Sequence, residues 1–279
     1  MRQLHKNLFV YYRGASPKRE QRDFIFERQL EDNTTKALIY LLEHADRTKV
    51  LAPFLSQIAG LKDEYDQQQV QFALQRVDIG RPTIPIRIAL AVAPIKGLLK
   101  SKSKGHLSGR PDAWIWADNK FALLLENKVN ASDQVSVDQI ERHIASASGW
   151  HKRNTKIVCI SWDDIYNFFS QLQRQSVGLD PVSKLLLSEF LEYLKMTGIA
   201  HATSFEIDDF AFFTRPPYDR LSIQKRIVAS KLERFTEELG SSPVIRKIVG
   251  LYGLKRIKPK SYVNPGVFRN NSTNFWITL

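Results

Sequence analysis

The sequence predicts a mixed α/β protein in which helices cover a central sheet. Three observations favour this class: a helical pattern opens the chain, strand-like segments follow it, and a further helix precedes a buried strand. Helical and strand patterns in this order are typical of a sheet with helices packed on it. With 279 residues, 43% of them hydrophobic, the chain can bury a sizeable core, and we expect an ordinary globular protein.

The first hundred residues contain the opening helix and two strands. From Lys18 to about Asp46, apolar residues recur at helical spacing, which fits one or two amphipathic helices. Residues 67–77 and 83–92 are instead rich in β-branched and alternating apolar residues and are bounded by glycine and proline, which indicates strands. Residues 96–110 are rich in Lys, Ser and Gly and predict a mobile basic loop.

A β-hairpin is predicted directly after this loop. Apolar runs at 113–117 and 121–129 are separated by Asp118-Asn119-Lys120, whose composition is typical of a tight turn. If these three residues form the loop, Asp112 lies opposite Glu126 on one face of the hairpin. A two-residue loop would put Asp112 on the wrong side. With the three-residue loop, the other face is continuously apolar and consists of Ala113, Ile115, Ala117, Phe121, Leu123 and Leu125.

A helix and a buried strand complete this part of the chain. The helix begins near Ser136, where Gln139 can close a capping box, and ends near Ser148. Residues 155–162 then form an apolar, strand-like run. The resulting order of helix, strands, hairpin, helix and strand is that of a sheet covered by helices.

Beyond Asp163 the character of the chain changes. Helical periodicity recurs in three segments, at 163–175, 181–198 and 219–239. The segment after Val244 carries KRIKPK and ends in the strand-like NFWITL. We therefore predict a core of residues 1–165 and a mainly helical C-terminal region, residues 166–279, with a basic, strand-like tail.

Charge and cysteine content limit the partners and the compartment. Lys and Arg number 41 against 29 Asp and Glu, so the net charge is +12 and the pI about 9.7, which indicates a polyanionic partner such as nucleic acid. The single cysteine, Cys159, excludes a disulfide framework and a thiolate zinc cluster, which favours the reducing cytoplasm. The N-terminus lacks the apolar segment of a signal peptide, and no apolar run is long enough to span a bilayer, so we expect no membrane role.

Two acids and a lysine of the hairpin can carry out phosphodiester hydrolysis. This reaction needs an attacking water and stabilisation of the charge that develops on phosphate, and Mg²⁺ held by carboxylates supplies much of both. Asp112, Glu126 and Lys128 provide two ligands and an amine that can orient or deprotonate the water. An E-x-K triplet arises by chance once per ~300 residues. The triplet therefore supports this interpretation only through its context, at the end of an apolar strand and downstream of a Pro-Asp pair.

The segments RPDAWI and LLLENKVN, followed by a glutamine-containing helix, resemble the PD-(D/E)xK (restriction-endonuclease-like) nuclease superfamily. The resemblance covers roughly residues 20–165 and implies an αβββαβ core. It also implies that Asp112 and Glu126 bind Mg²⁺, for which Mn²⁺ can substitute, and that Lys128 serves the attacking water. The implied activity is that of a metal-dependent endodeoxyribonuclease.

The same resemblance implies further site residues. The backbone carbonyl of Asn127 would be another metal ligand. Glu31, in LEDNTTKALIYLL, is similar to an acid that the first helix of such nucleases often contributes. Gln139 matches the first position of a Gln-x-x-x-Tyr-like element, and His143 stands where that element has tyrosine.

Most of these residues also have a purely structural interpretation, whereas a charged Glu126 at the end of so apolar a strand indicates a specific partner. Asp112 can start a turn, and Lys128 can be a strand-end lysine whose ammonium reaches solvent. Glu31 is equally explained as an acid in the first turn of a helix, where it complements the helix dipole. His143 fits a packing role, and Gln139 fits the capping box. Alternating tryptophans in a hairpin are more often core residues than a surface for stacking on bases, and this applies to Trp114 and Trp116.

The function expected from these features is Mg²⁺-dependent hydrolysis of DNA, in preference to RNA, in prokaryotic restriction, anti-phage defence or repair. Cutting both strands of a duplex usually needs two active sites, so a homodimer is expected, with residues 219–239 as a candidate interface. The main alternative is a non-catalytic nucleic-acid-binding or scaffold protein that keeps the nuclease fold. A basic protein-interaction module would explain the charge but not the three hairpin residues.

Overall fold

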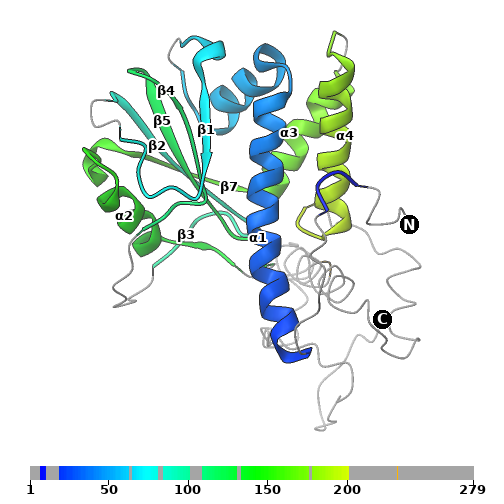
Figure 1. Cartoon of the computed structure of the whole chain (residues 1–279), viewed down its shortest axis with the longest axis horizontal. Helices are drawn as coiled ribbons and strands as arrows, with labels where there is room; N and C mark the ends of the chain where they lie inside the picture. Colours follow the sequence, from blue (N-terminus) through cyan, green and yellow to red (C-terminus); the bar gives the residue numbers. More distant parts are fainter. Residues whose placement is uncertain are drawn as a thin grey trace, which may run out of the picture. The chain divides into compact units, whose positions relative to one another are not determined.

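A five-stranded mixed sheet, flanked by helices, forms the centre of the part of the chain that the structure describes, as the sequence predicts. The computed structural model describes residues 7–10, 19–62, 65–80, 84–100, 109–130, 133–175, 178–200 and 231. The strand order is β1-β4-β5-β2-β7 (Figure 1). β4 is antiparallel to both β1 and β5, whereas β2 is parallel to both β5 and β7. These strands are β1 Gln71–Leu74, β2 Ile86–Ala93, β4 Ala113–Ala117, β5 Phe121–Asn127 and β7 Lys156–Ser161.

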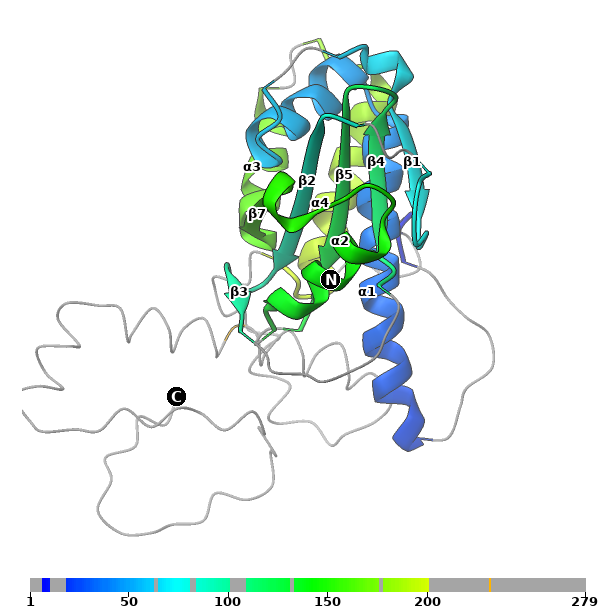
Figure 2. The same ribbon diagram turned by 90° about the vertical axis from the view of Figure 1, so that its left-hand side faces the viewer.

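Helices flank this sheet on both faces. Figure 2 looks onto the face that α2 covers, with α1 and α4 behind the sheet. Two separate groups of buried hydrophobic side chains result, one between the sheet and α1, α3 and α4, and the other between the sheet and α2. The helices are α1 Arg19–His44, α2 Val137–Ser146, α3 Trp162–Arg174 and α4 Pro181–Met196.

Short elements connect these parts. β3, Leu98–Leu99, pairs in parallel with β6, Val135–Ser136, and so forms a strand inside the segment predicted as a mobile loop. Residues 101–108 of that predicted loop lie outside the described residues. The remaining short helices are η2 Arg47–Leu51, η3 Phe54–Ile58, η4 Gln67–Gln69 and η5 Lys152–Asn154.

Two local predictions are only partly correct, because the strand expected over 67–77 is confined to β1 and the helix expected near Ser136 begins without a capping box; in both cases side-chain hydrogen bonds are the reason. The strand predicted over 67–77 starts as a 3₁₀ turn, because the Asp66 carboxylate accepts a hydrogen bond from the backbone of Gln68, 2.9 Å away. Ser136 is the N-cap of α2, but its side chain makes no capping hydrogen bond. A capping box exists instead at α3, between Ser161 and Asp164.

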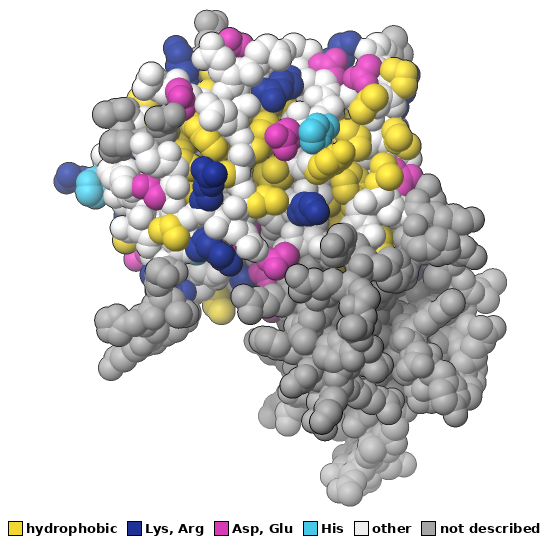
Figure 3. All heavy atoms as spheres, viewed as in Figure 1, with side chains coloured by type: hydrophobic (Ala, Val, Ile, Leu, Met, Phe, Trp, Pro, Cys, Tyr) yellow, Lys and Arg dark blue, Asp and Glu magenta, His cyan; other side chains and the backbone are white. Residues whose placement is uncertain are grey.

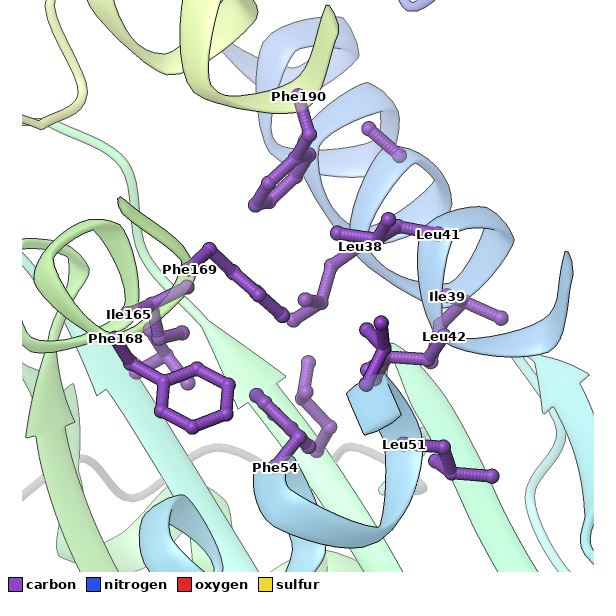
Figure 4. Packing of buried hydrophobic residues seen from close by; sticks show 14 of the residues in the cluster. Leu38, Ile39, Leu41, Leu42, Leu51, Phe54, Ile165, Phe168, Phe169 and Phe190 are labelled. Carbon is purple, nitrogen blue, oxygen red and sulfur yellow. The ribbon is translucent and has the colours of Figure 1, made fainter. Parts of the chain in front are cut away.

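The larger hydrophobic core joins α3 and α4 to the sheet. The Phe54 and Phe169 rings stack with their centroids 5.8 Å apart, and Phe190 packs edge-on against Phe169 at 5.6 Å (Figure 4). Leu38 and Leu42 of α1 approach the same group of rings. The helices from 162 to 196 therefore share one buried interior with the sheet, across the boundary predicted near residue 165.

The chain divides into two compact units, Met1–Ala202 and Thr203–Leu279. Only residue 231 of the second unit is among the described residues, so the predicted helix 219–239 and the tail lie outside them. Among the described helices, none combines the length and the apolar character that crossing a bilayer requires.

Candidate metal centre

The register of the β4–β5 hairpin is the predicted one. Ala117 pairs with Phe121 and Ala113 with Leu125, so the loop between them contains three residues. Asn119 in this loop has a φ of 59°, a left-handed conformation that asparagine tolerates better than most residues. The next pair in this register joins the position of Asp112 to that of Glu126, and both acids lie at the end of the hairpin remote from the turn.

Three carboxylates meet at this end of the sheet. Glu31 from α1, Asp112 from the segment before β4, and Glu126 from β5 each offer an oxygen, and these oxygens all lie within 4.8 Å of one another. The sequence separates Glu31 from Asp112 by 81 positions, so the packing of α1 on the sheet brings them together. Oxygens at this spacing can bind one divalent cation, although the acids alone do not select which.

Both carboxylate oxygens of Glu126 are held by α2. His143 Nε2 lies 2.8 Å from Oε2, and the side-chain amide of Gln139 donates a hydrogen bond to Oε1. Gln139 and His143 are four positions apart, so they lie on the same face of the helix. The Glu126 side chain is only 2% exposed, and a buried carboxylate needs such partners. Gln139 therefore hydrogen-bonds Glu126 and does not close a capping box. His143, expected to be a packing residue, also has Glu126 as a specific polar partner.

The ammonium group of Lys128 lies between two of the acids. It donates a hydrogen bond to Glu31 Oε1 and lies 3.4 Å from Glu126 Oε1. Its backbone is fixed by two further bonds, from Lys128 N to Val92 O and from Trp162 Nε1 to Lys128 O, both 2.8 Å. Burial favours the neutral amine, but the charges of Glu126 and Glu31 outweigh it and raise the pKa of Lys128 above its ordinary value. The amine is therefore protonated at neutral pH.

The Asp112 carboxylate is held by hydrogen bonds from Asn127, the residue between Glu126 and Lys128 in the chain. Its Oδ2 accepts hydrogen bonds from the backbone N of Asn127 at 2.8 Å and from its Nδ2 at 3.1 Å. Burial, reinforced by the negative charge of Glu126, raises the pKa of Asp112 to about 8. A positive ion at this place would reverse that shift, because it would favour the ionised carboxylate.

The segment before Asp112 lies directly on α2. A Cβ at Gly109 would be 2.6 Å from backbone atoms of Arg142 and His143, a distance that no side chain can accept. The backbone N of Gly109 also donates a hydrogen bond to Ser146 Oγ, 3.1 Å away. Only glycine permits this approach, which holds Asp112 close to the helix that holds Glu126.

Glu31 lies in the interior of α1 and not in its first turn. The helix begins at Arg19, so an interaction with the helix dipole does not explain Glu31. Burial raises its pKa above the ordinary range, opposed by the charge of Lys128 and the hydrogen bond from it.

No role was predicted from the sequence for the side chains of Thr35 and Asn127, although the backbone carbonyl of Asn127 was named as a ligand. The Thr35 hydroxyl accepts a hydrogen bond from the Asn127 side chain, and both residues are buried. One signal was present: strand alternation places Asn127 in an otherwise apolar series with Leu123, Leu125 and Val129. Trp114 and Trp116 are buried against α2, as expected for core residues, and are not available to stack on bases.

Comparison of the chain with protein-family models, with curated proteins and with solved structures gives no match. What the site can do chemically is therefore inferred from its geometry. Three carboxylates offer oxygen ligands within 4.8 Å of one another, a protonated lysine lies beside them, and two side chains of α2 fix the most buried acid. Such a site can bind a hard cation and orient a water molecule or an anionic group next to it.

Proposed function

We propose that the protein is a metal-dependent nuclease of the PD-(D/E)xK superfamily that hydrolyses phosphodiester bonds of DNA. One observation carries the proposal: Glu31, Asp112 and Glu126, from three separate segments, converge within 4.8 Å. Lys128 bonds one of these acids and lies beside another. Apart from β1, which adds a strand at the edge next to β4, and the short pair β3–β6, the elements α1, β2, β4, β5, α2 and β7 follow an αβββαβ order, which supports a restriction-endonuclease-like fold.

In the proposed reaction the three carboxylates would hold Mg²⁺ or Mn²⁺, with the backbone carbonyl of Asn127 as a further ligand. When bound, the ion would polarise a phosphate oxygen and lower the pKa of a bound water. Because its amine is protonated, Lys128 would orient the attacking water or stabilise charge on the phosphate, in preference to removing a proton. Gln139 and His143 would keep Glu126 in place.

The choice of DNA as substrate is supported by the net charge of +12, which belongs to the whole chain. On the face shown in Figure 3, lysine and arginine are interspersed with acidic and hydrophobic side chains and form no single basic patch among the described residues. A homodimer would supply the two active sites needed to cut both strands. A cytoplasmic role in restriction, anti-phage defence or repair would follow.

Cleavage assays with purified protein test this proposal. Plasmid and linear DNA are incubated with Mg²⁺, with Mn²⁺ and with EDTA, and the products are separated on gels. We expect metal-dependent nicking that is lost in Asp112→Ala and Lys128→Ala, with rates lower by about 10²-fold or more. Lys120→Ala is the matched control, because Lys120 belongs to a second acid-x-lysine triplet in the exposed turn of the same hairpin. Cleavage that survives in Asp112→Ala would refute the assignment.

A second candidate is a non-catalytic nucleic-acid-binding or scaffold protein with the same fold. One observation favours it: the Lys128 ammonium already places a positive charge between Glu31 and Glu126. In that case the lysine itself would neutralise the acids, and no ion would be required. Tight DNA binding without cleavage in either metal would favour this candidate.

A further inference from the structure

We propose that the side chain of Asn127 is a positioning residue that sets the distance between Glu31 and Asp112. By doing so, it would make the site selective for a small ion such as Mg²⁺. This inference rests on the proposed metal site and concerns the amide side chain, which is distinct from the backbone carbonyl of the same residue.

The place of Asn127 in the sheet is the first reason. Its neighbours on the same face of the chain, Leu125 and Val129, belong to the large hydrophobic core, and the Asn127 side chain is fully buried among them. Burying an amide without hydrogen bonds costs several kcal/mol, on the order of 2–7 by transfer measurements. Its Oδ1 has no hydrogen-bond partner among the described residues, so only the donor side of the amide offsets this cost.

The contacts of that donor are the second reason. Asn127 Nδ2 lies 3.1 Å from Asp112 Oδ2 and 3.4 Å from the backbone carbonyl of Glu31, and it donates a hydrogen bond to Thr35 Oγ1. Thr35 in turn donates to the same Glu31 carbonyl at 3.2 Å. One buried amide therefore joins the helical turn that carries Glu31 to the carboxylate of Asp112.

The geometry of the ion explains why this link matters. A shift of α1 by a single residue moves Glu31 by about 1.5 Å along the helix axis. Mg²⁺ requires near-octahedral ligands at about 2.0–2.1 Å, whereas Ca²⁺ accepts longer and more flexible coordination. A loosened α1 should therefore weaken Mg²⁺ binding far more than Ca²⁺ binding, an effect that a general loss of stability would not produce.

Asn127→Ala in the full chain tests the link. We expect Mg²⁺ affinity, measured by calorimetry, to fall about tenfold or more while Ca²⁺ affinity changes by less than about threefold. The kcat for DNA should fall with KM unchanged, because a fully buried side chain cannot contact substrate. Folding should persist, because two hydrogen bonds are retained in the variant. Asp112 still accepts one from the backbone N of residue 127, and Thr35 still donates one to the Glu31 carbonyl. Equal losses for both ions, or none, would overturn the inference.

A second set of variants protects the test against misfolding of Asn127→Ala. Thr35→Val removes the hydroxyl with little change of shape and should shift the Mg²⁺ to Ca²⁺ preference in the same direction, whereas Thr35→Ser should restore it. Thr34→Val is the matched control: Thr34 bonds Leu30 O and Tyr193 away from the acids, so its loss should lower stability without changing ion preference. An unchanged preference in Thr35→Val would overturn the inference by itself.

The outcomes also separate this inference from the proposed function. If the wild-type protein binds Mg²⁺ but cuts no DNA, the nuclease proposal fails, and the ion preferences of the variants still decide the role of Asn127. If the wild-type protein cuts DNA and Asn127→Ala matches it in kcat and ion preference, only the inference about Asn127 fails.

Discussion

At the scale of single residues, the site places ionisable groups where water is largely excluded. Asp112 shows the consequence most clearly, because burial raises its pKa to about 8. Lys128 has the opposite sign of charge, and the neighbouring acids hold it in its protonated form. Both shifts indicate a site whose negative charge is only partly compensated by the protein itself.

The raised pKa of Asp112 predicts a pH-dependent stability in the presence of EDTA. The folded value of about 8 exceeds the ordinary 3.8, so the protonated acid stabilises the fold fully at low pH, and this contribution is lost as the pH rises toward 8. Asp112→Asn, which cannot ionise, should therefore have a higher Tm than wild type near pH 8, by a few degrees, since 1 kcal/mol corresponds to roughly 2–4 °C in domains of this size.

Thermal unfolding from about pH 5 to pH 9 measures this difference, which should grow with pH. Asp118→Asn, in the turn at the other end of the hairpin, is the control. If the wild-type and Asp112→Asn curves run parallel across the range, Asp112 does not have the raised pKa assigned to it. Saturating Mg²⁺ should remove the advantage of the variant.

Lys128 offers a prediction that separates a role in the proposed reaction from a role in holding the ion. Lys128→Met removes a positive charge from between Glu31 and Glu126, so Mn²⁺ should bind severalfold more tightly, while cleavage falls by about 10²–10⁴-fold. Calorimetry and single-turnover cleavage measure the two quantities. A variant that loses metal affinity together with cleavage would show that the lysine supports the ion site and has no separate role in the reaction.

At the scale of elements, α2 acts as a support for β5 and for the segment before β4. Gln139 and His143 bond the Glu126 carboxylate, and Gly109 lies against the backbone of the same helix. Among the described residues, the larger core on the opposite face of the sheet is the one assembled from several helices. The position of two acids therefore depends on the packing of one ten-residue helix.

Two substitutions at His143 test this role of α2. His143→Phe leaves one oxygen of the buried Glu126 carboxylate without its donor and should destabilise the protein by about 1–3 kcal/mol while weakening Mg²⁺ binding. His143→Gln retains a donor and should keep most of both properties. Urea unfolding and calorimetry provide the measurements. Equal behaviour of the two variants would mean that His143 acts only by filling space.

At the scale of the whole molecule, the larger core determines which part of the chain must be present. The Phe169 ring contacts the rings of both Phe54 and Phe190, and these residues belong to α3, η3 and α4, respectively. Met1–Ala202 forms one compact unit. The site at the end of β4 and β5 thus depends on residues well beyond the strand that ends at Ser161.

Truncation tests this dependence. A chain that ends after Ala202 should stay folded and bind Mn²⁺ like the full protein, because it keeps both helices. A chain that ends after Ile165 loses Phe169 and Phe190, and removal of one such ring typically costs about 3–5 kcal/mol. It should therefore be unfolded. Circular dichroism and Mn²⁺ titration decide the matter, and a folded chain ending at 165 would support the boundary that the sequence suggests.

The sequence by itself determined the hairpin and the relative places of Asp112, Glu126 and Lys128. Turn chemistry sets the loop length, and strand alternation then sets the face of each side chain, so both depend only on near neighbours. The tertiary structure alone decided the partners of these residues: Glu31 for Lys128, His143 for Glu126, and Thr35 for Asn127. Two of these three contacts join positions more than 90 residues apart, and the third joins a strand to a helix, so each depends on how a helix packs against the sheet, which no local rule of spacing contains.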